Sequence, residues 1–214
     1  MEKNLHRHFR LMDEKIFDPE FQNQHVASKI VVGLERISEA FRKLLWEHAK
    51  TMGVSPIQIQ ILVFVAYHKA SFSKVSYLAK EFGVTKPTIS DAVRVLVLKK
   101  LAEKVFDQTD NRSYSIRLTK EGKKLVERTE LFSNPILHEI KKIEPDDLDR
   151  VFDTVRTLVF QLSEIGVIGV QRTCQACQFF ETKKDKPFCS VLDHHLRRAD
   201  FRLDCPEFES KDSL

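Results

Sequence analysis

Apolar side chains recur every three or four positions in two long stretches of the chain. The spacing in the first stretch is 4-3-4-3-4 and involves Ile30, Leu34, Ile37, Phe41, Leu44 and His48. This period predicts a helix with one apolar face, and Gly53 is expected to end it because glycine adopts the left-handed conformation of a helix cap. A second long helix is predicted to start at Pro145, with an apolar face formed by Leu148, Val151, Phe152, Val155, Leu158, Val159 and Leu162.

Shorter elements are predicted between these two helices. A nearly all-apolar segment, SPIQIQILVFVAYHKA, starts with Ser55 as N-cap and Pro56 at the first helical position. Its β-branched residues also allow a strand, but its length and capping signals favour a buried helix. A short helix around Leu78, a turn at Gly83 and a second helix capped by Thr85 are expected to follow.

Two short strands are predicted near residues 103–107 and 113–118, because the turn-forming sequence QTDNR lies between them. Thr119 is expected to cap another helix. A pair of short helices followed by a hairpin is a winged helix-turn-helix. The predicted fold class is therefore mainly α with a small β-hairpin wing, flanked by long helices.

The predicted domain organisation has five parts. They are an N-terminal arm at 1–25, a long helix at 26–54, the winged helix-turn-helix at 55–129, C-terminal helices at 130–170 and a four-cysteine tail at 171–214.

The second helix of the pair has short polar and basic side chains near its start. An α-helix fits the major groove of B-DNA, so these side chains are candidates for contacts with bases and phosphates. The candidates on this helix are Lys86, Thr88, Ser90, Asp91 and Arg94. Asp91 is expected to orient a neighbouring cation or to accept a hydrogen bond from a cytosine. Ser73 is a further candidate for phosphate, whereas Lys99 and Lys100 equally suit an ordinary solvated surface.

Net positive charge is concentrated in the same region. Residues 71–130 contain 13 Lys or Arg against 8 Asp or Glu, while residues 171–214 contain 8 of each. The net charge of the whole chain is only +4. A positive middle segment is compatible with a nucleic-acid partner, and equally with a solvated surface.

Residues from about 55 to 128 resemble the multiple-antibiotic-resistance regulator (MarR) family. The resemblance is carried by VSYLAKEFGVTKPTISDAVRVLVLKKLAEKV and by DNRSYSIRLTKEG, which is similar to the family's wing. It implies that Asp110 and Arg112 hold the wing in shape and place the arginine at the DNA. It also implies that the flanking helices form a homodimer, with a packed bundle inside one chain as the alternative. Such a dimer reads a palindromic operator whose half-sites lie about 34 Å apart.

All four cysteines lie in the tail, with the spacing Cys174-x2-Cys177-x11-Cys189-x15-Cys205. Four thiolates complete the coordination of one Zn²⁺ ion, and a [4Fe–4S] cluster is the alternative metal centre. Free structural thiols or a redox disulfide pair are the alternatives without a metal. A tail of about 40 residues is too small to fold on its own core, which also favours a metal. His194 and His195 are reserve ligands. The metal is expected to be either structural or sensory.

The sequence therefore predicts a homodimeric, sequence-specific DNA-binding transcription regulator, more specifically a repressor. The alternatives are an iron–sulfur or thiol redox-sensing regulator and, from another class, a winged-helix protein-interaction module without DNA binding. A small-molecule or redox effector is a further expected partner.

An enzyme is not expected, because the chain has no nucleophile–base pair and no glycine-rich phosphate loop. With 42% hydrophobic and 31% charged residues, no run long enough to span a membrane and no signal peptide, the protein is expected in the cytoplasm.

Overall fold

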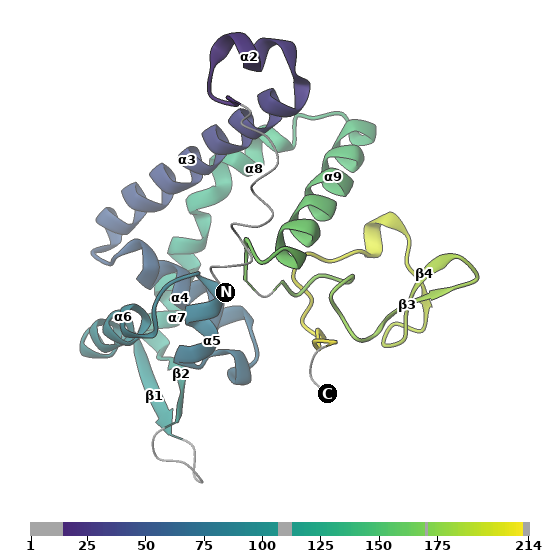
Figure 1. The fold of residues 1–214 in the computed structure, drawn as a ribbon. Helices are drawn as coiled ribbons and strands as arrows, with labels where there is room; N and C mark the ends of the chain where they lie inside the picture. The colour runs from purple at the N-terminus through teal and green to yellow at the C-terminus, as the bar shows by residue number, and fades with distance from the viewer. Residues whose placement is uncertain (1–14, 107–112, 170, 212–214) are drawn as a thin grey trace.

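The computed structural model describes residues 15–106, 113–169 and 171–211, and the first long helix runs along one side of it (Figure 1). A short helix, α2 (Pro19–Gln24), precedes this long helix, α3 (Val26–Met52). Gly53 has φ +66° and ends α3, as predicted. His48 lies on the same helix, and its Nε2 is 2.8 Å from the carbonyl oxygen of Arg128, which ties α3 to a later helix.

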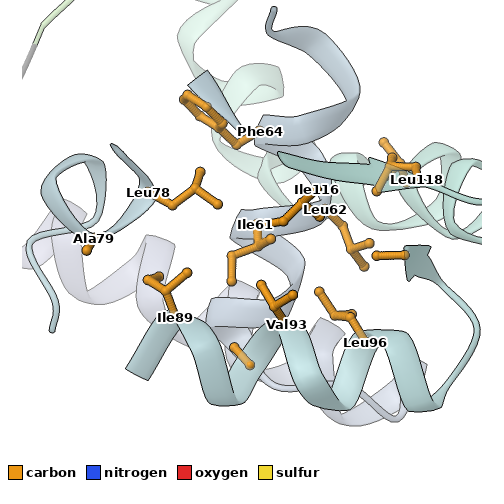
Figure 2. Packing of buried hydrophobic residues seen from close by; sticks show 13 residues of the cluster. Ile61, Leu62, Phe64, Leu78, Ala79, Ile89, Val93, Leu96, Ile116 and Leu118 are labelled. Carbon is orange, nitrogen blue, oxygen red and sulfur yellow. The ribbon is translucent and has the colours of Figure 1, made fainter. Parts of the chain in front are cut away.

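The core of the chain forms around α4 (Pro56–Tyr67). Ser55 and Gln58 form a capping box, in which each side chain accepts a hydrogen bond from the other residue's backbone N–H. The segment is therefore a helix and not a strand. Ile61 and Leu62 are completely buried and face side chains of the next helices and of the hairpin (Figure 2).

The predicted helix pair is present as α5 (Val75–Glu81) and α6 (Lys86–Leu98). Gly83 has φ +62° in the turn between them. The hydroxyl of Thr85 accepts a hydrogen bond from the N–H of Thr88 at 3.3 Å and caps α6, as predicted.

The hairpin consists of β1 (Ala102–Phe106) and β2 (Tyr114–Leu118), which pair antiparallel from Ala102 opposite Leu118 to Phe106 opposite Tyr114. Each strand is within one residue of its predicted bounds. The predicted wing residues Asp110 and Arg112 lie outside the described residues.

The helix α7 (Lys120–Thr129) starts at the predicted cap, Thr119. Gly122 in its first turn packs against the backbone of Leu101. A Cβ atom at position 122 would lie only 1.9 Å from the carbonyl oxygen of Leu101. This contact fixes how closely α7 approaches the end of α6.

Gly122→Ala is expected to lower the free energy of unfolding by about 1–3 kcal/mol, because the backbone must move to admit the methyl group. Urea unfolding followed by circular dichroism measures this change. Lys124→Ala, on the exposed side of the same helix, is the control and should stay within about 0.5 kcal/mol. Equal stabilities for the two variants would contradict the contact.

The second half of the chain contains α8 (Asn134–Ile140), α9 (Pro145–Glu164) and a small sheet. The sheet has the order β3–β4–β5, formed by Phe180–Lys183, Lys186–Cys189 and His194–His195. Short 3₁₀ turns lie at Ala70–Phe72, Glu130–Ser133 and Arg198–Asp200. The tail lies beside α9 (Figure 1).

Within the described residues, no single helix is both long and apolar enough to cross a membrane. Only α3 and α4 taken together reach the length and composition, and they are bent by 91° relative to each other. The side chains of α4 form the centre of the core.

Candidate nucleic-acid interface and cysteine site

One side of α6 is packed in the core and the other is exposed. Ile89 and Val93 are fully buried. The exposed side presents four of the five residues predicted on this helix, namely Lys86, Thr88, Asp91 and Arg94. Ser90 is half-buried. The first half of α6 is therefore a row of polar and basic side chains on a helix that the core holds rigidly.

Asp91 and Arg94 lie one helical turn apart and contact each other. The Asp91 Oδ1 to Arg94 Nη2 distance is 3.3 Å, and both side chains are mostly exposed. This contact agrees with the expectation that Asp91 orients a neighbouring cation. Since exposed ion pairs contribute little energy, Arg94 can exchange this partner for a phosphate or a base.

The structure corrects the prediction for Ser73, whose side chain is only 1% exposed. Ser73 follows a 3₁₀ turn and lies beneath β2, where its carbonyl oxygen accepts a hydrogen bond from the N–H of Ile116 at 2.9 Å. Its hydroxyl therefore cannot contact DNA in this structure. Of the two weaker candidates, Lys99 donates a hydrogen bond to the carbonyl oxygen of Gly53, and Lys100 is exposed after the end of α6.

The four cysteines come together although up to 31 positions separate them along the chain. All four are free thiols, and Cys174, Cys177, Cys189 and Cys205 line one small cavity in the tail. Burial raises the pKa of the Cys174 thiol, while the N–H of Arg202 donates to its Sγ at 3.3 Å and acts in the opposite sense. The reserve ligands His194 and His195 are exposed and do not line this cavity.

Arg172 was missed by the sequence analysis, although it lies two residues before the first cysteine. Its side chain is 6% exposed and its guanidinium joins the tail to α5. Nη1 donates to Glu81 Oε2 at 2.7 Å, and Nε donates to Asp204 Oδ1 at 2.6 Å. Arg172 Nη1 also lies 3.2 Å from the hydroxyl oxygen of Tyr77 on α5.

Further contacts hold the tail against α5 and against the end of α4. The second carboxylate oxygen of Asp204, the residue before Cys205, lies 2.9 Å from Nε2 of His68 at the end of α4. Burial raises the pKa of Asp204, but hydrogen bonds from His68 and Arg172 outweigh this effect and hold the pKa below its usual value. Gly169 approaches α5 so closely that a Cβ there would lie 2.4 Å from the carbonyl oxygen of Lys80.

The tail also contacts α9. Arg198 lies 3.2 Å from Asp149 Oδ2 and 2.7 Å from Asp153 Oδ2, both on α9. The guanidinium of Arg156 lies over the ring of Phe201 at 4.2 Å. The tail therefore bridges the last long helix and the supporting helix of the helix-turn-helix.

The middle of the chain matches a known protein family. Residues 52–113 match the family model described as MarR family. This segment is similar to the MarR family. It contains all of α4, α5, α6 and β1, and with them every candidate residue on α6. The MarR family consists of transcription regulators and not of enzymes, as the sequence predicted. The four cysteines lie outside the matched residues.

Solved structures show the same fold. The S. aureus MepR–DNA complex is 22% identical, with a TM-score of 0.54, and the match covers 62% of this chain and 97% of that chain. A MarR transcriptional regulator from Methanosarcina mazei Go1 is 19% identical, with a TM-score of 0.53, and the match covers 63% of this chain and 98% of that chain. No curated protein matches the sequence significantly.

Proposed function

We propose that the chain is a transcription regulator that binds double-stranded DNA through the exposed side of α6. The observation that carries this proposal is the division of α6 into a buried side and an exposed row with Lys86, Thr88 and Arg94. A helix held this way can enter the major groove without rearranging the core. The MepR structure of the same fold was solved as a DNA complex, which supports the proposal.

The functional unit is a homodimer. The apolar seam of α3 lacks cover along much of its length, because Ile30, Ile37 and Phe41 are 53%, 51% and 40% exposed. On α9, Val151 and Val155 are 46% and 38% exposed, and none of the residues of this helix is buried. Exposed apolar faces of this extent mark protein interfaces, so a second copy is proposed to cover both helices.

A two-fold dimer presents two copies of α6, and its target is proposed to be a palindromic operator. A dimer seated across two half-sites blocks access to the duplex, which supports repression rather than activation. Such a protein acts where the chromosome is, in the cytoplasm.

Arg94→Ala is expected to weaken binding to duplex DNA by about 10- to 100-fold, because the helix loses a cation aimed at the groove. The probe is a duplex that the purified protein itself enriches from a random pool, and fluorescence anisotropy measures the affinity. Arg150→Ala is the matched control, since Arg150 forms the same type of ion pair, with Asp147 at 3.4 Å, on α9. An equal loss for both variants would contradict a role for α6.

The salt dependence of binding tests the function as a whole. Contacts with phosphates release counterions, so the affinity of the intact protein should fall steeply between about 50 and 200 mM salt. If no duplex is enriched, or if the affinity is insensitive to salt, the chain is instead a winged-helix module for protein contacts.

A further inference from the structure

We propose that the tail is a strut that fixes the helix-turn-helix relative to α9, and that Arg172 thereby determines which spacing of half-sites the protein selects. The selection of a spacing rests on the proposed function, whereas the strut itself belongs to the protein without DNA. Arg172 is a positioning residue, since its buried guanidinium is not available to a duplex.

The guanidinium of Arg172 is fixed in direction as well as in position by Glu81, the last residue of α5. Nη1 donates to Glu81 Oε2 at 2.7 Å, and Nη2 donates to Glu81 Oε1 at 3.0 Å. Two parallel hydrogen bonds between a planar guanidinium and a carboxylate set the angle between the two groups and not only their distance. The side chains of Arg172 and Glu81 are only 6% and 15% exposed, so water does not readily replace either partner.

The other edge of the same guanidinium is held by the tail and by α4. Asp204 accepts from Nε at 2.6 Å and from Nη2 at 3.3 Å, and the guanidinium carbon lies 5.0 Å from the centre of the Phe64 ring. His68, directly after α4, binds the same carboxylate. Arg172 therefore joins the tail to α4 and α5 at one point. Its removal would leave the carboxylates of Glu81 and Asp204 without the cation that they share.

The path from α9 to this contact is short. Gly169 lies five positions after Glu164, the last residue of α9, and closely approaches the carbonyl oxygen of Lys80 on α5. The N–H of Val167 donates to the carbonyl oxygen of Leu162 at 2.9 Å, so the chain stays attached to α9 as the helix ends. A short, hydrogen-bonded connection therefore leads from the end of α9 to α5.

The tail also returns to α9 at positions far from that end. Arg198 contacts Asp149 and Asp153, and Phe201 lies under the guanidinium of Arg156. The chain through α7 and α8 already links the helix-turn-helix to α9 (Figure 1). The tail is thus a second connection between the same elements. Two separate connections hold an orientation that a single one would leave free to rotate.

This orientation sets the spacing of the two reading helices in the proposed dimer. The helix α9 belongs to the proposed interface, and α5 and α6 share one core through Leu78 and Ile89. A rotation of the helix-turn-helix about α9 would therefore move α6 relative to its copy. Each base pair added between two half-sites shifts one of them by about 3.4 Å and turns it by about 35°. A rigid dimer matches one spacing, whereas a dimer without the strut accepts several and binds the best one less tightly.

The first test measures the distance between the two copies of α6 in the full-length protein without DNA. A spin label at Asp91, whose side chain is 72% exposed, reports this distance by pulsed electron paramagnetic resonance. The label is introduced with a non-natural amino acid, because the native cysteines would react with a thiol reagent. The distance distribution should be at least about twice as wide in Arg172→Met as in the otherwise wild-type protein. Equal widths, or a monomeric protein that gives no distance, would overturn the strut.

Arg197→Met is the matched control for this measurement. Arg197 lies in the same tail, its side chain is 82% exposed, and it forms an ion pair with Asp200 at 3.0 Å. The same substitution at this position leaves the contact with α5 intact, so the distribution should stay narrow. Glu81→Gln is a milder second variant that keeps the shape of the contact and removes its charge. It should widen the distribution less than Arg172→Met does, and it decides the question if Arg172→Met does not fold.

The second test uses unlabelled protein and the enriched duplex. Two base pairs inserted between the half-sites should weaken binding of the wild-type protein by at least about tenfold, because its reading helices no longer reach both sites. In Arg172→Met the same insertion should weaken binding by about threefold or less. A duplex with a single half-site should bind both proteins equally within about twofold, since α6 itself is unchanged.

The outcomes separate this inference from the proposed function. An insertion penalty that Arg172→Met leaves unchanged would overturn the role of the strut while DNA binding stands. An equal loss on the single half-site would show that Arg172 only maintains the fold of α5, and would overturn that role as well. If the wild-type protein enriches no duplex, the DNA-binding proposal fails, and the widths measured without DNA still decide whether the tail is a strut.

Discussion

Ile37→Asp is expected to convert the dimer into monomers and to reduce DNA affinity by about 100-fold or more, because each monomer then holds a single half-site. Ile37 lies in the middle of the apolar seam of α3 and is half exposed in the single chain. A two-fold interface would bring both copies of the new carboxylate into an apolar contact, where desolvation of a charge is costly. Analytical ultracentrifugation measures the assembly, and anisotropy with the enriched duplex measures the affinity.

Lys43→Asp is the control for this experiment. Helical geometry places Lys43 on the side of α3 away from the seam, and its side chain is 76% exposed. The same carboxylate at this position should leave the dimer intact. A dimeric Ile37→Asp protein with normal DNA binding would show that the seam has another function.

Ile61→Ala is expected to lower the free energy of unfolding by about 2–5 kcal/mol. Ile61 is completely buried on α4, and its side chain points toward Ile89 and Val93 of α6 (Figure 2). The truncation leaves a cavity directly beneath the proposed reading helix. Since domains of this size are stable by only about 5–15 kcal/mol, the variant should unfold at much lower urea concentration.

Urea unfolding at one fixed protein concentration measures this change, because a dimer's apparent stability depends on concentration. Leu98→Ala is the control, since Leu98 is 72% exposed at the end of α6. It should change the stability by less than about 0.5 kcal/mol. If both variants lost the same stability, α4 would not be the centre of the core.

Local signals in the sequence predicted most of the helices and their ends. Gly53, Ser55, Thr85 and Thr119 all act at their predicted helix ends, because caps depend on residues only a few positions apart. The exposed side of α6 was also predicted, since helical period separates buried from exposed positions. The short helix α8 was not separated from its neighbours in the sequence prediction, which gave only C-terminal helices at 130–170.

Helix caps and helical periodicity could not predict contacts between segments that are distant in the sequence. Ser73 was predicted as a phosphate contact, but it lies buried beneath β2, which comes more than 40 positions later in the chain. Arg172 forms a salt bridge with Glu81, which lies 91 positions earlier in the chain, and no local sequence pattern predicts this contact. The cysteine spacing predicted that the tail would gather its thiols, but not which part of the chain the tail would contact.

The close approach of Gly169 to the carbonyl oxygen of Lys80 has a consequence for inherited variation. Any side chain at position 169 would wedge the tail away from α5 while every cysteine and every charged partner kept its chemistry. A chain with alanine at position 169 would keep all four cysteines, yet its tail would have to shift relative to α5. The contact between Arg172 and Glu81 would be disturbed with neither of the two residues changed.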